Sequence, residues 1–144
     1  MIMPAPGLFQ WNTAALGQAV SQLALHQQWQ DKYRLLMQLG KQLPSLDGQW
    51  RVDSAQVQGC ESQVWLYHLA IEQQHYFLID SDARIIKGLI ALVLNGVQGK
   101  TAAQIAAFDA SACFEQLGLS QQLSPSRTNG LVAVVNKIKS LSDH

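Results

Sequence analysis

One cysteine in this chain stands where a reactive thiol could reach a partner. Cys60 follows Gly59, between short extended segments over residues 50–57 and a long β-branched and aromatic run over residues 64–71. Glycine tolerates backbone angles that other residues avoid, so the Gly59–Cys60 pair predicts an accessible loop tip. As a thiolate, such a group attacks divalent sulfur in thiol–disulfide or thiol–persulfide exchange. The alternative is that Cys60 is a small buried apolar residue, which is common for an isolated cysteine.

The sequence neighbours of Cys60 do little to ionise it. An unperturbed thiol has a pKa of about 8.5, so only a small fraction is thiolate at neutral pH. Nearby backbone N–H groups would lower this pKa, whereas the negative charge of Glu61 would raise it. Activation must therefore come from a distant part of the chain or from a partner protein.

Other groups of catalytic type are scattered. Cys113 stands at an apolar position beside Phe114, so we expect it in the core; it could be a resolving thiol only if the fold brought it near Cys60. His68 or His75 could be the base of a cysteine hydrolase at Cys60, but no motif for an oriented dyad or an oxyanion pocket is present. No histidine has metal-ligand spacing and no cofactor motif is recognisable, so the sequence predicts neither metal nor cofactor.

Composition limits the class of protein. The chain has 144 residues, 48% of them apolar, which suits one core and hence a single domain over residues 1–144. Ten basic side chains balance ten acidic ones, and no basic tract could follow a phosphate backbone, so nucleic acid is not expected as a partner. No apolar run approaches the roughly 20 residues of a membrane span, and no secretion signal is recognisable. We therefore expect a soluble, cytoplasmic protein with both thiols reduced.

Periodicity predicts an α+β fold in which a small antiparallel sheet of about three strands is packed on one face by helices. Strands are expected near residues 49–56, 63–72 and 75–79, with a short connection at 73–74. Helices are expected near residues 14–24, 28–39, 85–97, 101–107, 109–117 and 125–141, the one over 85–97 being the buried central helix. Residues 1–11 look like a loose arm. In the helix over 28–39, Lys32 is expected to face outward.

Three spaced segments resemble the SufE/CsdE family of sulfur acceptors. The first is Gly59-Cys60-x-Ser62-x-Val64-Trp65, the second runs from Asp80 through Asp82 to Leu89, and the third is the Ser-Pro-Ser-Arg helix start within residues 123–131. The resemblance spans about residues 29–139. Segments 29–34 and 39–44, with Glu61 after the cysteine, look more like the CsdE branch than SufE itself.

The resemblance implies a function. Cys60 would carry a persulfide received from a pyridoxal-phosphate-dependent cysteine desulfurase of the CsdA/SufS type, and the chain would stimulate that enzyme. The sulfur would pass on to a SufBCD-type scaffold for iron–sulfur cluster assembly, or to another thiolation pathway. The fold would be the one shared with IscU-type iron–sulfur scaffolds. Because cofactor chemistry would reside in the desulfurase, the chain itself would be an accessory transfer protein.

Two roles remain open for Arg127. The resemblance places its motif near the cysteine loop, where a guanidinium could hold an anion in fixed geometry. Alternatively it is a structural tie to Asp82 or to a helix end. Asp80 and Asp82 stand between a strand and a helix, so we expect them to cap that helix.

The alternative function is an iron–sulfur assembly scaffold of IscU-like fold. A cluster usually needs several thiolates. This chain has two cysteines, one of them expected in the core, and that shortage favours the sulfur acceptor.

Overall fold

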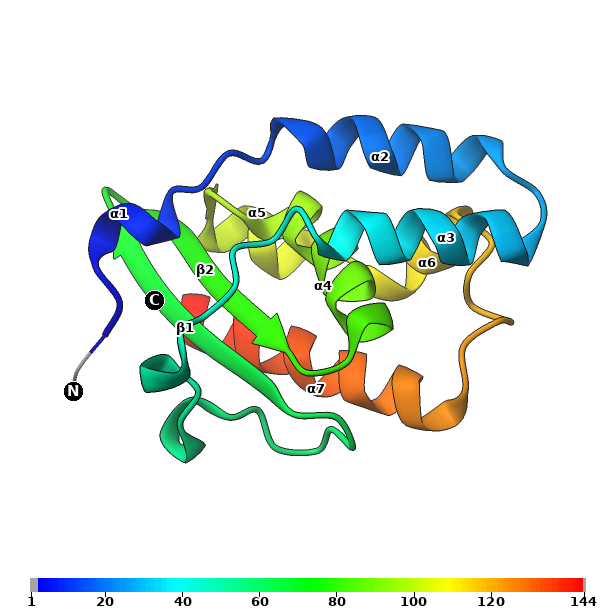
Figure 1. The fold of residues 1–144 in the computed structure, drawn as a ribbon. Helices are drawn as coiled ribbons and strands as arrows, with labels where there is room; N and C mark the ends of the chain where they lie inside the picture. Colours follow the sequence, from blue (N-terminus) through cyan, green and yellow to red (C-terminus); the bar gives the residue numbers. More distant parts are fainter. Residues whose placement is uncertain (1–2, 144) are drawn as a thin grey trace.

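The computed structural model describes residues 3–143. Figure 1 shows a long β-hairpin beside a group of helices. In chain order the elements are α1 (Pro6–Phe9), α2 (Ala14–Leu25), α3 (Trp29–Gly40), two 3-10 helices (Gly48–Trp50 and Asp53–Ala55), β1 (Val64–Ile71), β2 (Gln74–Ser81), α4 (Arg84–Val97), β3 (Lys100–Thr101), α5 (Ala102–Ala107), α6 (Ala110–Gln116) and α7 (Pro125–Ser142). The predicted α+β class is confirmed.

The sheet is antiparallel, with strand order β1-β2-β3. The hairpin turn between β1 and β2 has two residues of positive φ, Glu72 at 51° and Gln73 at 68°. Two consecutive positive φ values give a turn whose twist matches that of the paired strands. The strands predicted over 63–72 and 75–79 are therefore confirmed, each with small shifts at its ends.

The strand predicted over residues 49–56 is wrong. This segment forms the two 3-10 helices, and its backbone pairs with the sheet only at an isolated bridge between Gln56 and Trp65 in the described chain. Polar ties hold it out of the sheet: Arg51 pairs with Asp80 at 2.9 Å, and the Trp50 carbonyl accepts a hydrogen bond from the Tyr67 hydroxyl at 2.7 Å. The third strand is instead β3, which pairs with β2.

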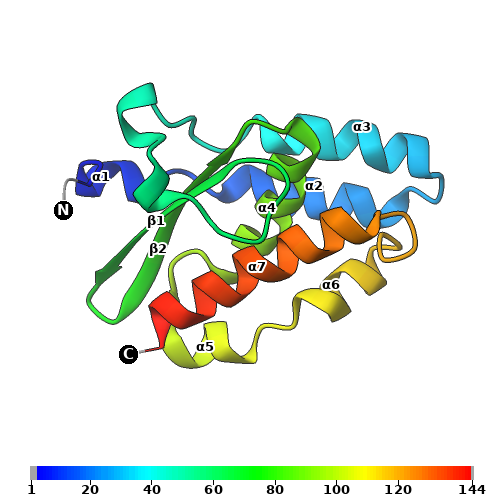
Figure 2. The same cartoon turned by 90° about the horizontal axis from the view of Figure 1, so that it is seen from below.

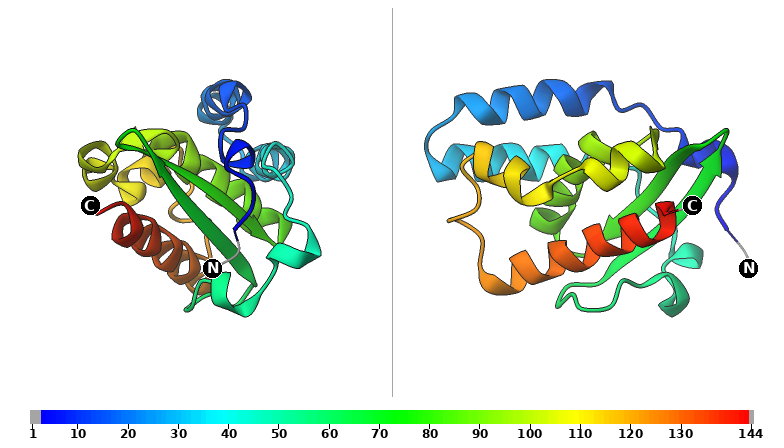
Figure 3. Two further views of the ribbon diagram at one scale, coloured as in Figure 1. Left: turned by 90° about the vertical axis from the view of Figure 1, so that its left-hand side faces the viewer. Right: turned by 180° about the vertical axis from the view of Figure 1, so that it is seen from behind.

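Successive side chains of the hairpin strands point to opposite faces of the sheet, so the core is divided into two clusters. On the helical face, Val64, Leu66 and Phe77 join the main cluster. On the other face, Trp65 and Tyr67 join a smaller cluster supplied by the N-terminal segment and the loop after α3. The main helices thus cover one face of the sheet, as predicted, while short segments shield the other (Figure 3).

The central helix α4 is buried on most of its circumference, as predicted. It packs closely against α3, and the two backbones meet at Gly88 of α4. A Cβ atom built on Gly88 would lie 2.2 Å from the carbonyl oxygen of Leu36 in α3. Only glycine permits this approach, and the contact sets the spacing between α3 and α4.

The loose arm predicted over residues 1–11 is wrong for its described part; residues 1 and 2 lie outside the described residues. Phe9 is fully buried, and its carbonyl oxygen accepts a hydrogen bond from Gln98 Nε2 at 2.8 Å. Trp11 Nε1 donates to the Phe77 carbonyl at 3.2 Å. Phe9 and Trp11 therefore anchor the N-terminal segment, although its prolines and glycine had suggested a flexible arm.

The position of Lys32 also differs from the one that the sequence pattern predicts. It is 7% exposed, and its ammonium donates to the carbonyl oxygen of Leu117 at the end of α6. A cation at a helix C-terminus satisfies a carbonyl that has no partner within the helix and suits the negative end of the dipole. Lys32 thus ties α3 to α6, and the prediction that it faces outward is wrong.

Candidate functional site

The Cys60 loop is tied at both ends. Where it leaves the preceding segment, the Val57 N–H donates to the Val64 carbonyl at 2.8 Å, and Gly59 turns the chain with a φ of 93°. Just before β1, Gln63 and Asp82 form a reciprocal pair. The Gln63 N–H donates to Asp82 Oδ1 at 3.1 Å, and the Asp82 N–H donates back to the Gln63 carbonyl at 3.2 Å.

Helix α7 forms the wall against which this loop packs (Figure 2). Its N-terminus is set by Ser124, whose hydroxyl accepts the Arg127 N–H at 3.3 Å. Further along the helix, Gly130 presents its backbone to the cysteine: Cys60 Sγ donates to the Gly130 carbonyl at 3.3 Å. A Cβ atom on Gly130 would lie 3.6 Å from Sγ, an ordinary van der Waals distance, so the thiol packs directly against this position of the helix.

A pocket of about 410 Å³ opens between the loop and α7. Five residues predicted from the sequence line it: Cys60, Glu61, Ser62, Val64 and Arg127. The structure thus brings together the cysteine segment and the Ser-Pro-Ser-Arg segment, which lie far apart in the chain.

The other three predicted residues are not among those that line the pocket. Gly59 packs against α7, where its Cβ position would be 3.3 Å from that of Ala133. Trp65 points to the opposite face of the sheet, and the Arg51 guanidinium lies 5.1 Å from its ring centroid. Asp82 supports the loop through Gln63.

The environment of Cys60 keeps it a neutral thiol in this conformation. The side chain is half-buried, and burial raises the pKa of the Cys60 thiol above its ordinary value. Burial likewise raises the pKa of Cys113, which packs against the core from α6 and does not line the Cys60 pocket. The structure therefore does not make Cys113 a resolving partner.

The two strand histidines are placed away from this pocket. His68 Nε2 and His75 Nδ1 lie 2.7 Å apart across the hairpin, with ring centroids 5.0 Å apart. Neither lines the Cys60 pocket. The hydrolase hypothesis needs a base within reach of the thiol, and this geometry does not favour it.

Arg127 is half-buried at the pocket and forms no ion pair within 4.0 Å among residues 3–143. The alternative of a structural tie to Asp82 is thus not formed. Its guanidinium remains available to an anion that enters the pocket beside Cys60.

The capping roles predicted for Asp80 and Asp82 are wrong. The N-cap of helix α4 is Ala83, which has no capping side chain, and Ser81 Oγ accepts the Ala83 N–H at 3.1 Å. Asp80 is instead fully buried, where it pairs with Arg51 at 2.9 Å and Lys87 at 3.1 Å. It fastens the segment that precedes the cysteine loop to the sheet and to α4.

Sequence reasoning did not name as site residues the others that line the pocket, which are Ala83, Ile85, Ile86, Ser124, Ser126 and Gly130. For Gly130 the signal was present, because residues three or four apart share one face of a helix and Gly130 stands three positions after Arg127. Within residues 3–143, no cluster of three or more His, Cys, Asp or Glu side chains is arranged to hold a metal ion. In the same range, no helix is both long and apolar enough to cross a membrane.

The chain resembles known proteins over most of its length. Residues 17–142 match the family model described as "SufE: Fe-S metabolism associated domain". The sulfur acceptor protein CsdE of Escherichia coli (strain K12) is 46% identical over 112 residues, covering 77% of this chain and 76% of that protein. A SufE-like protein of Haemophilus influenzae is 36% identical over 123 residues, covering 85% of this chain and 98% of that protein.

A solved structure supports the fold independently. The solution structure of a hypothetical protein from Thermus thermophilus aligns with a TM-score of 0.67 at 15% identity, covering 87% of this chain and 90% of that one. At this identity the likeness concerns the fold alone. The family model and the curated relatives confirm the resemblance, its CsdE branch included, and show that this chain belongs to the SufE family.

Proposed function

We propose that Cys60 accepts sulfur from the persulfide of a pyridoxal-phosphate-dependent cysteine desulfurase and carries it to another protein. The observation that carries this proposal is the meeting of Cys60 and Arg127 in one pocket, from segments far apart in sequence. The pocket offers one thiol on a loop, and the related CsdE is named a sulfur acceptor.

The transfer balances without an external oxidant. The Cys60 thiol gives up its proton, and its sulfur attacks the outer sulfur of the donor persulfide. A new S–S bond forms on Cys60 while the donor S–S bond breaks, and the donor cysteine leaves as a thiolate that takes up the proton. The products are a Cys60 persulfide and a reduced donor thiol, so the oxidation state is passed on with the sulfur atom.

Loading requires the loop to move. In the described conformation Cys60 Sγ rests on Gly130, with its pKa raised by burial, so it is poorly ionised. Docking of a desulfurase that turns Cys60 outward would return the thiol to water and lower its pKa. Gly59, already at a φ of 93°, can absorb such a backbone change.

Arg127 gives the pocket its cation. A persulfide that folds back into the pocket as an anion would meet a guanidinium that forms no ion pair within 4.0 Å in the described chain, although Glu61 also lines the pocket. Arg127 would thus stabilise the loaded state.

Intact mass spectrometry tests the proposal. Incubation with a cysteine desulfurase and cysteine should add about 32 Da, one sulfur atom, because an accessible thiol exchanges with a persulfide. The Cys60→Ser variant should gain nothing, and the Cys113→Ser variant should load as the native chain does. Sulfur uptake by Cys60→Ser would refute the assignment.

The acceptor of the sulfur is a further part of the proposal. We propose a protein of iron–sulfur cluster assembly, such as a SufBCD-type scaffold, because the matched family is described by iron–sulfur metabolism. Loaded protein should lose its extra sulfur on mixing with the true acceptor, and retention of the added mass would exclude the candidate tested. The alternative, that the chain is itself a scaffold, is less favoured because Cys113 does not share the Cys60 pocket.

A further inference from the structure

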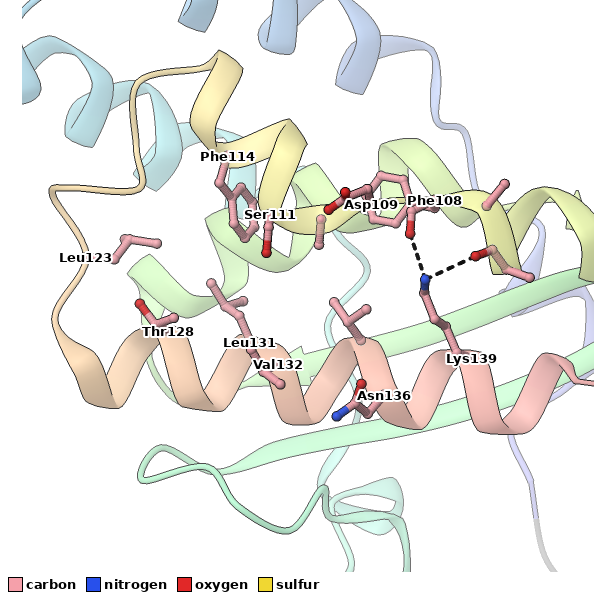
Figure 4. Close-up of a pocket in the computed structure, with 14 residues that line it drawn as sticks. Phe108, Asp109, Ser111, Phe114, Leu123, Thr128, Leu131, Val132, Asn136 and Lys139 are labelled. Atoms are coloured by element: carbon pink, nitrogen blue, oxygen red, sulfur yellow. Dashed lines mark hydrogen bonds between the residues drawn. The ribbon is translucent and has the colours of Figure 1, made fainter.

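A second pocket, of about 460 Å³, lies between α7 and the α5–α6 pair (Figure 4). It is distinct from the Cys60 pocket, because the two share no lining residue. Arg127 and Gly130 of α7 line the Cys60 pocket, whereas Leu131 and Val135 line the second one. Its volume is within the range of sites for small molecules.

The pocket has an apolar end and a charged end. Phe114 and Leu123 stand at one end in Figure 4, and Lys139 stands at the other. Between them Val132 is 50% exposed. A ligand that covered Val132 would remove apolar surface from water.

Lys139 is held by backbone carbonyls rather than by a carboxylate. Its Nζ atom donates to the carbonyl oxygens of Phe108 at 2.7 Å and Ala106 at 3.3 Å, and it forms no ion pair within 4.0 Å among residues 3–143. An ammonium has three donors, so one remains after these two bonds. The two carbonyls hold the cation in place and leave its positive charge for an anion.

A carboxylate that also lines the pocket, that of Asp109, limits the choice of ligand. Asp109 caps α6, and its Oδ1 accepts the Ala112 N–H at 3.0 Å. A second negative group on the ligand would face this carboxylate, so a monoanion fits better than a dianion. Thr128 and Asn136 add neutral polar groups along α7.

We propose that this pocket binds a small monocarboxylate with an apolar body, its carboxylate on Lys139 and its chain lying over Val132 toward Phe114. A charge-assisted hydrogen bond would fix one end and apolar burial the other. The site does not depend on Cys60 chemistry.

Three probes with the same eight-carbon length, octanoate, octanamide and octylamine, distinguish the contribution of the head-group charge to binding from that of apolar contact. Chemical-shift titration of the ¹⁵N-labelled full chain should give a dissociation constant for octanoate on the order of 1 mM, with shifts centred on α5 to α7. Octanamide should bind about tenfold more weakly, because it lacks the charge-assisted bond to Lys139. Octylamine should bind most weakly.

Two variants and a control assign the site. Lys139→Met should abolish the preference for octanoate over octanamide, while Lys137→Met, on an exposed position of the same helix, should preserve it. Val132→Trp should fill the pocket and weaken both ligands; it also serves if Lys139→Met fails to fold. Equal binding of octanoate and octanamide, an unchanged preference in Lys139→Met, or tightest binding of octylamine would overturn the proposal.

Discussion

Burial acts on two ionisable side chains of this protein with opposite outcomes. For Cys60, burial is the cause that acts on the thiol, and it raises the pKa. For Asp80, burial also raises the pKa, but hydrogen bonds from the Leu46 N–H, Lys87 and the Ser81 N–H, with the Lys87 charge, outweigh it and lower the pKa overall. The chain thus keeps its reactive group neutral and its structural group charged.

The lowered pKa of Asp80 predicts an acid-dependent loss of stability. A carboxyl group whose pKa is lower in the folded state contributes stability above its unfolded pKa, about 3.9, and loses it as pH falls through the folded value. Asp80→Asn should reduce the free energy of unfolding by about 3 kcal/mol at neutral pH, because it leaves Arg51 and Lys87 without their counter-charge. Urea unfolding between about pH 2 and pH 7 measures this.

The exposed Asp47→Asn change is the matched control for Asp80→Asn. Asp47→Asn should keep the native fall in stability at low pH, whereas Asp80→Asn should flatten it. A pH profile of Asp80→Asn with the native slope would show that Asp80 is not the group responsible.

Replacing Arg127 separates its two hypothetical roles. Because its side chain forms no ion pair in the described chain, Arg127→Ala should change the free energy of unfolding by no more than about 0.5 kcal/mol. Sulfur uptake on Cys60 should fall about tenfold, the loss expected for one charge-assisted contact to an anion. The initial rate of uptake by mass spectrometry measures this.

Arg34→Ala is the control for charge, because Arg34 is exposed on α3 and its contact to Asp31 is 3.9 Å. It should load at the native rate. If Arg127→Ala also loads at the native rate and melts at the native temperature, Arg127 has no part in the site.

At the scale of elements, one glycine decides how closely α4 approaches α3. Gly88 admits the backbone of α3 to that of α4, whereas at Gly130 of α7 a Cβ atom would make only ordinary contact with Cys60 Sγ, at 3.6 Å. Helical periodicity marks the buried faces of both helices, but it cannot show which glycine touches a neighbouring element. A glycine within a helical pattern can equally be a position with no packing role.

Two helical glycines offer a matched test. Gly88→Ala would place a Cβ atom 2.2 Å from the Leu36 carbonyl oxygen, so α3 and α4 must separate, and we expect a loss of about 3 kcal/mol. In α2, Gly17→Ala has only Asn95 Oδ1 at 4.0 Å, so it should stabilise the fold by about 0.5 to 1 kcal/mol through helix propensity. Thermal and urea unfolding measure both, and a tolerated Gly88→Ala would contradict the close packing.

Most helices and the hairpin could be predicted because apolar periodicity is a local property. The segment over residues 49–56 could not, because its position depends on Asp80, which lies far along the chain. Lys32 was misplaced for the same reason: its partner is the carbonyl of Leu117, 85 positions away. The local pattern of apolar residues therefore predicts the helices and strands. Where that pattern is ambiguous, polar contacts between distant residues decide the position of the segment.

For the whole molecule, α7 is the element that contributes to both proposed sites. Its two sides line two separate pockets, one with Cys60 and the other with Lys139. Cys60 and Arg127 could be paired from the sequence only through the family resemblance, because neither spacing nor periodicity places residue 127 beside residue 60. The raised pKa of Cys60 needed the structure, since it depends on burial against α7.

The contact between Cys60 and Gly130 spans 70 residues and joins the middle of the chain to its last helix. During refolding, the hairpin and its turn can form from nearby residues, but the thiol has no shelter until α7 docks. Pulsed alkylation during refolding from urea should therefore label Cys60 rapidly until late in the reaction. Protection of Cys60 before α7 acquires its native hydrogen-exchange protection would contradict this order.

The same separation has a consequence during synthesis. A chain still on the ribosome carries Cys60 for the time needed to make α7, and over that interval the cysteine has the reactivity of a thiol in an unfolded peptide. The nascent chain is therefore the form most open to oxidation or premature modification. Helix α7 is the element that closes this window, so slow synthesis of α7 would lengthen the time for which Cys60 is exposed.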